Sequence, residues 1–378
     1  MKKKFLITLL KIISVATISA NKMMIPFEQN GKIGFVNENM EVIFYPEYSK
    51  ILNYSKQGFY VIEVNSNNHL LKHELIFSDG SKLALDTRTS IKFIGDEYYV
   101  IFKDSKSIVY DIRSHKMIKS FDGYELMDSD VEDFIPIINI TDETKARYFF
   151  IDLKGNEYLS KNDYMRIISH DSKTHSFVFW DKEADNRIAD FEGNLRFDKL
   201  IGEIGCIGDG LFLGGNAKEQ GYYNLKGKLV IPIKGLETKN LNLCPVFCCS
   251  VIPCIIENDS IFVQEAIFEK SASNWAIINN KGKIMKKNIS ADYIFPYTED
   301  NVAIMYKNLN RKKVYSMLDK KGNVITQKNY DIIKEPINGY SRACNNNIDY
   351  LISTKDGKEY RVFEILIRSR KDWYSFSI

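Results

Sequence analysis

The 378-residue sequence has few prolines, no excess charge of one sign and, after its first 20 residues, no long apolar run. It contains 8 Pro, and Lys plus Arg number 52 against 49 Asp plus Glu, a formal net charge of +3. Four of those lysines lie in the first 20 residues, so the remainder carries 48 basic and 49 acidic side chains. A near-neutral body argues against nucleic acid as the main partner, because phosphate binding needs a concentrated basic face.

Motifs of catalysis and cofactor binding are also lacking. The sequence contains no nucleophile elbow, no H-E-x-x-H pair, no Walker loop and no dinucleotide fingerprint. We therefore predict no catalytic residue, cofactor or metal ligand. The apolar content of 44% is nevertheless high enough for a sizeable core, which excludes wholesale disorder.

Residues 1–20 have the layout of a secretory signal peptide. Lys2, Lys3 and Lys4 precede an apolar stretch over 5–18, and small residues such as Ser19 and Ala20 follow it. No later stretch approaches the roughly 20 apolar residues that cross a bilayer. The sequence thus predicts an exported protein, located in the periplasm, at the cell surface or outside the cell, with no transmembrane span after its leader.

A short pattern recurs along the remaining residues, 21–378. Each copy has an aromatic or apolar run, then Asp or Asn, two spacers, Gly and a β-branched run, and neighbouring copies are mostly about 34–41 residues apart. The runs are typical of half-buried strands. Asp or Asn suits the first position of a type I turn, and Gly suits the fourth, where φ is positive. The turn residues are Asn37, Asp152, Gly155, Asp190, Gly193, Asn224, Gly227, Asn279, Gly282, Asp319, Gly322 and Gly357.

Each copy is therefore predicted to be a β-hairpin extended by one or two short strands. A lone hairpin is marginally stable in water, so successive units must pack on one another. The period predicts an all-β, β-propeller-like repeat fold, with an open twisted β-solenoid as the alternative.

Three copies resemble a known repeat. Gly34-Phe35-Val36-Asn37 leads to Val42, Ile43, Pro46 and Tyr48, Gly221–Pro232 has the same order, and Trp275 precedes Asn279 and Gly282. These segments are similar to WG repeats, also called KWG repeats, of bacterial secreted and surface proteins. The family pattern is Trp-Gly-Tyr-Ile-Asp, two spacers, Gly-Lys, then Val-Ile-Pro and a Tyr. The resemblance implies an all-β repeat fold and an interaction role, without a shared catalytic residue.

Four of the six cysteines crowd one segment, at about 241–256, which interrupts the repeat as an insertion. In an oxidising compartment such clustering predicts a disulfide. The candidate pairs are Cys244–Cys254 and Cys248–Cys254, since the adjacent Cys248 and Cys249 do not readily pair in ordinary geometry. Unpaired apolar packing and a metal site are the alternatives. His69 and His73 stand four residues apart in a predicted strand and loop, and we expect both to be solvated.

Together these features predict an exported, non-catalytic β-repeat protein that binds another protein or an envelope glycan through its loops. The alternative is an exported hydrolase or lyase on the same scaffold, because a fold does not determine a function.

Overall fold

The computed structural model is almost entirely β. It describes residues 23–367 except 65–68, 87–88, 105, 123–124, 127–133, 143–144, 153–156, 159–165, 181–185, 198–201, 217, 235–246, 258–259 and 264–274. The predicted signal peptide lies outside the described residues. None of the helical segments within them is both long and apolar enough to cross a membrane.

The described strands form nine small antiparallel sheets, numbered here in chain order. Sheet 1 contains β1 (Ile25–Gln29), β2 (Lys32–Val36) and β3 (Val42–Tyr48). Sheet 2 contains β4 (Lys50–Tyr54), β5 (Gly58–Val64), β6 (Leu70–Phe77) and β7 (Lys82–Ala84). Sheet 3 contains β8 (Ser90–Ile94), β9 (Tyr98–Lys103), β10 (Lys106–Asp111) and β11 (Met117–Asp122). Sheet 4 contains β12 (Glu125–Leu126), β13 (Phe134–Asp142), β14 (Lys145–Asp152) and β15 (Glu157–Tyr158).

The second half of the chain continues the series. Sheet 5 contains β16 (Arg166–Asp171), β17 (Ser176–Trp180) and β18 (Asn186–Asp190), with a 3₁₀ turn at Ser172–Thr174. Sheet 6 contains β19 (Glu203–Gly208), β20 (Leu211–Gly215), β21 (Gln220–Asn224) and β22 (Leu229–Pro232). Sheet 7 contains β23 (Val251–Glu257), β24 (Ser260–Phe262), β25 (Trp275–Asn279) and β26 (Ile284–Ile289). Sheet 8 contains β27 (Tyr293–Ile294), β28 (Val302–Leu309) and β29 (Lys312–Asp319). Sheet 9 contains β30 (Ile332–Ile333), β31 (Tyr340–Asn345), β32 (Ile348–Ser353) and β33 (Glu359–Arg361), and a short helix follows at 362–367.

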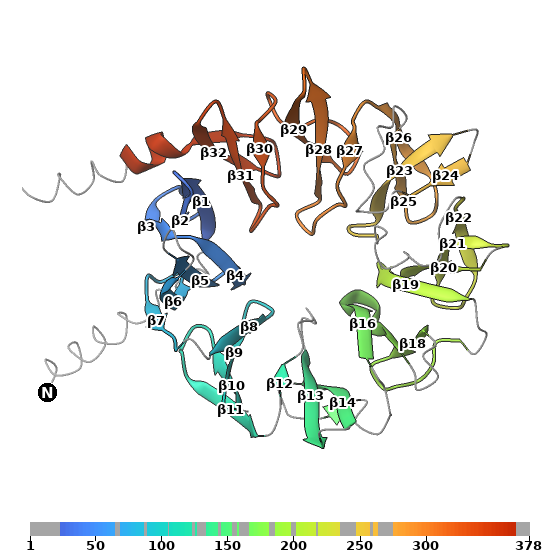
Figure 1. Cartoon of the computed structure of the whole chain (residues 1–378), viewed down its shortest axis with the longest axis horizontal. Coiled ribbons are helices and arrows are strands. Elements are labelled where there is room, and N and C mark those ends of the chain that lie inside the picture. Colours follow the sequence, from blue (N-terminus) through green and yellow to red (C-terminus); the bar gives the residue numbers. More distant parts are fainter. Residues whose placement is uncertain are drawn as a thin grey trace, which may run out of the picture.

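The sheets are arranged around a common centre as the blades of a β-propeller (Figure 1). In sheets 3 and 6 the first strand lies nearest the centre and the fourth lies at the rim (Figure 1). Sheets 5 and 8 replace the fourth strand by isolated bridges at Leu195 and Val324. Sheet 7 has the order β24-β23-β25-β26. Here β24 follows β23 in sequence and pairs with one edge of β23, while β25 pairs with the opposite edge.

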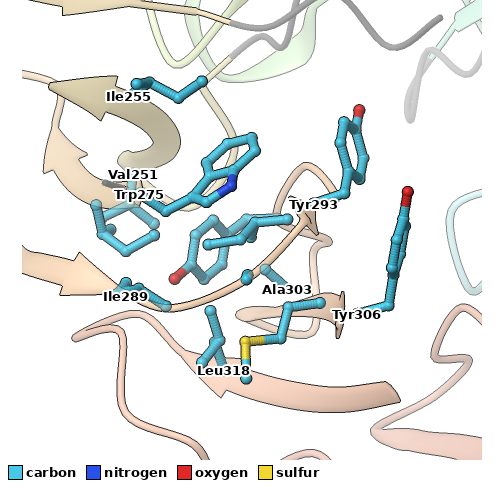
Figure 2. Packing of buried hydrophobic residues seen from close by; sticks show 13 residues of the cluster. Val251, Ile255, Trp275, Ile289, Tyr293, Ala303, Tyr306 and Leu318 are labelled. Atoms are coloured by element: carbon cyan, nitrogen blue, oxygen red, sulfur yellow. The ribbon is translucent and has the colours of Figure 1, made fainter. Parts of the chain in front are cut away.

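Apolar side chains fill the space between neighbouring sheets. Between sheets 7 and 8, Trp275 and Ile255 pack against Tyr293 and Leu318, and the Trp275 and Tyr293 rings meet edge to face at 5.8 Å (Figure 2). Residues of β23 face both neighbouring sheets, because Ile252 lies in the core shared with sheet 6, whereas Ile255 lies in the core shared with sheet 8. Each sheet is therefore stabilised by burial on both of its faces.

The ring closes between its first and last sheets. Ile25 and Phe27 of β1 pack with Leu351 of β32 and with Val362 and Ile365 of the C-terminal helix. Lys334 Nζ of sheet 9 lies 2.6 Å from the carboxylate of Glu28 in sheet 1. This contact confirms the propeller prediction and excludes the open solenoid, whose terminal units would not meet.

Polar groups connect the turns that precede the second strand of each sheet, which we call the inner turns. Gly210 N–H donates to Asp171 at 2.7 Å, joining sheets 5 and 6, and Ser250 N–H donates to Asp209 at 2.6 Å, joining sheets 6 and 7. The Cys249 thiol donates to the Thr298 carbonyl at 3.4 Å.

The same series of contacts continues across the closure. Gly339 N–H donates to Asp300 at 2.9 Å, joining sheets 8 and 9. Asn338 Nδ2 donates to the carbonyls of Met24 at 2.7 Å and Ser55 at 3.3 Å, so one side chain contacts sheets 1 and 2. Lys56 then reaches Asp96 of sheet 3 through its backbone N–H and its ammonium group.

The two histidines have different environments, and the expectation that both are solvated is wrong for His73. Only 9% of His73 is exposed, and it hydrogen-bonds to the Tyr60 hydroxyl and, at 3.0 Å, to the Asp86 carbonyl. It lies on β6, an inner strand of sheet 2 that neighbouring sheets cover. His69 is exposed at the start of that strand.

Asn338→Asp should destabilise the ring. Aspartate has nearly the size of asparagine and tolerates the positive φ of 54° at this position. Its carboxylate, however, cannot donate hydrogen bonds to the Met24 and Ser55 carbonyls. We expect a loss of about 2 kcal/mol or more in thermal or urea unfolding. Asn310→Asp is the control, because Asn310 is an exposed turn residue with a similar φ of 51°. Equal effects of the two substitutions would show that Asn338 does not hold the closure.

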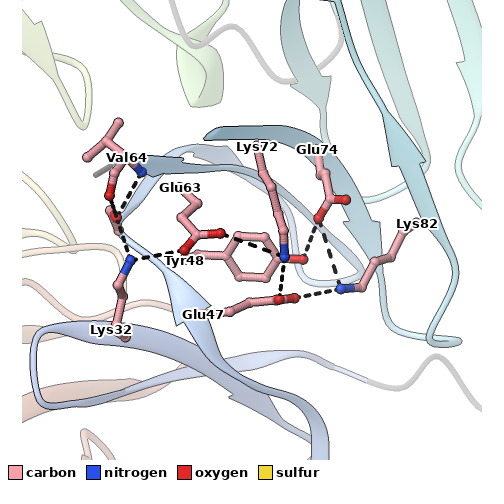
Figure 3. A network of polar contacts seen from close by, with 9 residues as sticks. Lys32, Glu47, Tyr48, Glu63, Val64, Lys72, Glu74 and Lys82 are labelled. Carbon is pink, nitrogen blue, oxygen red and sulfur yellow. Dashed lines mark hydrogen bonds and ion pairs between the residues drawn. The ribbon is translucent and has the colours of Figure 1, made fainter. Parts of the chain in front are cut away.

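Charged side chains also connect sheets 1 and 2. The carboxylate of Glu47 lies 2.6 Å from both Lys72 Nζ and Lys82 Nζ, and Tyr48 donates to Glu74 at 2.7 Å (Figure 3). Partial burial acts to raise the pKa of Glu47, but the two lysines outweigh it and lower the pKa to about 2. Burial and the neighbouring Glu74 raise the pKa of Tyr48, which keeps its hydroxyl a donor.

Glu47→Gln should make stability less dependent on pH. The folded-state pKa of Glu47 is below its usual 4.5, so its carboxylate stabilises the fold above pH 4.5 and loses this effect as pH falls toward 2. We expect the variant to have a lower Tm than the wild type at pH 7, by an amount that shrinks toward pH 3. Glu38→Gln, at an exposed turn, controls for the loss of one surface charge. A Tm difference independent of pH would contradict the assignment.

Candidate functional site: the outer turns

The turns that join the third and fourth strands, which we call the outer turns, are built by the recurring Asx–Gly pattern. In sheet 6, Asn224 Oδ1 accepts the backbone N–H groups of Lys226 at 3.0 Å and Lys228 at 3.1 Å. Gly227 N–H donates to the Asn224 carbonyl at 2.9 Å, and Gly227 has a φ of 70°. The side chain thus satisfies donors that the tight turn leaves without strand partners.

The same geometry recurs in other sheets. Asn279 and Gly282 form it in sheet 7, and Asp319 and Gly322 form it in sheet 8. In sheet 5, partial burial acts to raise the pKa of Asp190, but hydrogen bonds from Asn194 lower it, and Gly193 has a φ of 90°.

Some outer turns depart from the pattern. In sheet 1, Asn37 accepts the N–H groups of Asn39 and Glu41, and Met40 takes the positive φ in place of Gly. In sheet 9, Gly357 N–H donates to Ser353, with no Asx at the first position. Asp152 ends β14, but Gly155 and the turn between them lie outside the described residues.

The outer turns of sheets 7 to 9 each pack on the segment that follows the outer turn of the preceding sheet. A Cβ added at Gly282 would lie 3.4 Å from Ile231 of sheet 6, and one at Gly322 would lie 2.8 Å from Lys286 Cβ of sheet 7. A Cβ at Gly357 would overlap the Ile325 carbonyl of sheet 8. Lys286 Nζ also donates to Asn323 at 3.4 Å. The outer turns of sheets 6 to 9 therefore form one continuous surface.

Lysines cover this surface. The outer turns and adjoining strand residues of sheets 6 to 9 carry ten lysines, all exposed, which we call the lysine arc: Lys226, Lys228, Lys281, Lys283, Lys286, Lys287, Lys320, Lys321, Lys355 and Lys358. The same segments hold three acidic residues, Asp319, Asp356 and Glu359, and Glu359 is paired with Lys328 at 2.6 Å. Within the part of the chain that the structure describes, none of the ten lysines forms an ion pair.

The outer turns of sheets 1, 2 and 5 carry acidic residues, whereas that of sheet 3 combines Asp111 with Arg113 and Lys116. Glu38 and Glu41 occupy the turn of sheet 1, Asp79 that of sheet 2, and Asp190 and Glu192 that of sheet 5. Among the described outer turns, those with at least two exposed lysines therefore belong to four consecutive sheets. The net charge of the whole sequence does not reveal this feature, because it adds the lysines of the arc to acidic residues elsewhere in the chain. Counting charge repeat by repeat would have found it, since the Gly-Lys of the family pattern recurs at Gly227 and Gly282.

The cysteine segment differs from the prediction in the described residues. Cys248, Cys249 and Cys254 are free thiols, so the predicted Cys248–Cys254 bond is absent. Cys254 faces the core between sheets 6 and 7, and burial there raises its pKa to about 12. Cys248 packs on the other side of sheet 7. Cys244 lies outside the described residues, and Cys254, its predicted partner, is a free thiol.

The expected insertion at about 241–256 is also shorter in the structure than in the prediction. Its residues from Val251 onward belong to β23, which pairs along its length with β25. Cys249 and Ser250 form a tight turn before that strand, with φ values of 55° and 66°. Among the described residues, no group of three or more His, Cys, Asp or Glu side chains is placed to hold a metal ion.

Two segments of the chain, 33–67 and 315–347, match the family described as WG containing repeat. The chain is a WG repeat-containing protein. Each matched WG repeat begins in the strand before an outer turn, β2 or β29, and ends just after β5 or β31, the second strand of the next sheet. One repeat thus supplies an outer turn and the following inner turn.

The family's small residue has a physical role in these repeats. Gly34 stands at the second position of the first WG repeat, and a Cβ there would lie 2.7 Å from both the Phe44 carbonyl oxygen and the Phe27 ring. Glycine therefore lets β3 and the Phe27 ring approach β2 closely. Ala276 takes this position beside Trp275.

Solved structures of similar shape have low sequence identity with this WG-repeat chain. A eukaryotic initiation factor is 11% identical, with a TM-score of 0.46 over 90% of this chain and 96% of that one. BamB from Moraxella catarrhalis is 11% identical, with a TM-score of 0.31 over 89% of each chain. AztD from Citrobacter koseri is 9% identical, with a TM-score of 0.33 over 90% of this chain and 93% of that one. No curated protein matches the sequence.

Gly357→Ala should destabilise the protein more than Gly80→Ala. Both glycines have positive φ, 71° and 89°, so both substitutions strain the backbone by about 1–2 kcal/mol. A Cβ at Gly80 meets open space, whereas one at Gly357 overlaps the Ile325 carbonyl of the preceding sheet. We expect an additional loss of at least about 1 kcal/mol for Gly357→Ala in urea unfolding. Equal losses would mean that the outer turns do not support one another.

Proposed function

We propose that this WG-repeat protein is an exported, non-catalytic scaffold that binds a protein or a glycan of the cell envelope through its outer turns. The observation that supports binding is the continuous surface of sheets 6 to 9, where each turn from sheet 7 on contacts the sheet before it and the ten exposed lysines form no ion pair with any described residue. A rigid array of like charges raises the local concentration of oppositely charged partners.

The fold favours this role for a physical reason. Strand residues of adjacent sheets are committed to the cores between them, as Trp275 and Tyr293 are, so they are not free to contact a ligand. The turn side chains make few core contacts and can vary without loss of the ring. Export is inferred from residues 1–20, whose basic start and apolar stretch are typical of a signal peptide.

The test is binding of the protein that lacks residues 1–20 to isolated envelopes of the source organism. We expect saturable sedimentation of the protein with the envelopes, measured against the same protein without them. Prior treatment of the envelopes with protease or with periodate separates a protein partner from a glycan partner. Absence of saturable binding to any envelope preparation would reject the proposed function.

A further inference from the structure

We infer that the lysine arc is the binding site for a linear, carboxylate-bearing glycan that lies along the outer turns of sheets 6 to 9. This inference rests on the proposed function and names the partner's chemistry. Its first support is the number and state of the charges. Ten exposed lysines outnumber three acidic residues in these segments, and none of the lysines forms an ion pair within the described residues.

The arrangement of these charges favours a linear partner. Each sheet contributes one turn with at least two lysines, and contacts at Gly282, Gly322 and Gly357 join each turn to the sheet before it. The charges therefore form a row that repeats once per sheet. A polymer with regularly spaced charges can pair with successive positions in such a row, and its several weak contacts add up through linkage.

The side-chain chemistry of the arc disfavours a folded protein as the partner. Its large exposed apolar side chains are Met285 and Val324, and the ring of Tyr360 beside it is half-buried under Lys358 Nζ, 4.9 Å from the ring centroid. Protein interfaces usually depend on a desolvated core with Tyr, Trp or Arg anchors. Single-stranded nucleic acid needs a series of aromatic rings on which its bases stack, and one half-buried ring does not provide it.

Carboxylates on the same face disfavour a broad polyanion such as duplex DNA. In an antiparallel sheet, the turn between the first two strands and the turn between the last two lie at the same end. The inner turns therefore share this face with the arc, and they carry Asp209, Glu299 and Asp300. A narrow single chain can follow the lysines at the rim without approaching these carboxylates.

The lysines also fit a partner that is held by charge more than by shape. The arc contains ten lysines and no arginine. An ammonium group is a point charge, without the planar fork by which arginine fixes one geometry on a phosphate or carboxylate. Such a site binds a repeating uronate chain in several registers, with an affinity that falls as salt rises.

The experiment measures binding of short alginate chains to the protein that lacks residues 1–20, with neutral dextran as the uncharged probe. The arc variant replaces Lys226, Lys281 and Lys321 by Gln, since their side chains are exposed and only their backbone groups take part in the turns. The control variant replaces Lys50, Lys116 and Lys218 by Gln. These lysines are exposed outside the arc, so the control loses the same amount of charge. A third variant carries Arg at the three arc positions.

We expect the wild type to bind alginate and not dextran, with an affinity that falls steeply with salt. The arc variant should bind at least about tenfold more weakly at low salt, while the control and arginine variants stay near the wild type. Equal Tm values establish that all variants are folded. No alginate binding, or equal weakening in the arc and control variants, would overturn the inference.

Two further probes identify the alternatives. Tighter binding of duplex DNA or of poly-glutamate than of alginate would reject a glycan in favour of a nucleic acid or an acidic protein. If the arc variant still sediments with envelopes as the wild type does, the inference fails while the proposed function stands. If the wild type binds no envelope but its arc binds alginate, the proposed function fails instead.

Discussion

Burial of each sheet between two neighbours is the constraint on which the rest of this structure depends. A sheet of three or four short strands is marginal by itself, and each sheet here completes its cores with residues of the next. Such a series leaves two faces uncovered unless its ends meet. Contacts of β1 with β32 cover them, and Asn338 joins sheet 9 to sheets 1 and 2 at the inner turns.

The WG repeat is not the structural unit, and this offset has a consequence. Each matched segment runs from the strand before an outer turn to the second strand of the next sheet, so every repeat belongs to two sheets. Covalent continuity therefore connects neighbouring sheets in addition to the contacts that their inner and outer turns make. Sheet 1 has three strands, β1 to β3, and its outer turn at Asn37 shows that they correspond to the second, third and fourth strands elsewhere.

The division of labour within one repeat explains how such a protein acquires a binding surface. Strand residues such as Phe35 and Trp275 are held by packing on both sides, and Gly34 is held by the close approach of a neighbouring strand. At the outer turn, Asx and Gly are needed for geometry, whereas the spacer residues face solvent. The turn of sheet 1 carries Glu38 and Glu41 and that of sheet 7 carries Lys281 and Lys283, so the same turn supports opposite charges.

The sequence by itself determined the all-β class, the recurring unit and the turn residues, because these follow from local patterns such as Asn224 with Gly227. It could not determine that the ring closes, since Asn338 and Met24 are far apart in the chain and meet through tertiary contacts. Nor could it show that His73 is buried or that Cys248 and Cys254 face opposite sides of one sheet. The lysine arc was hidden for the same reason: a net charge adds all residues together, whereas the fold decides which of them lie side by side.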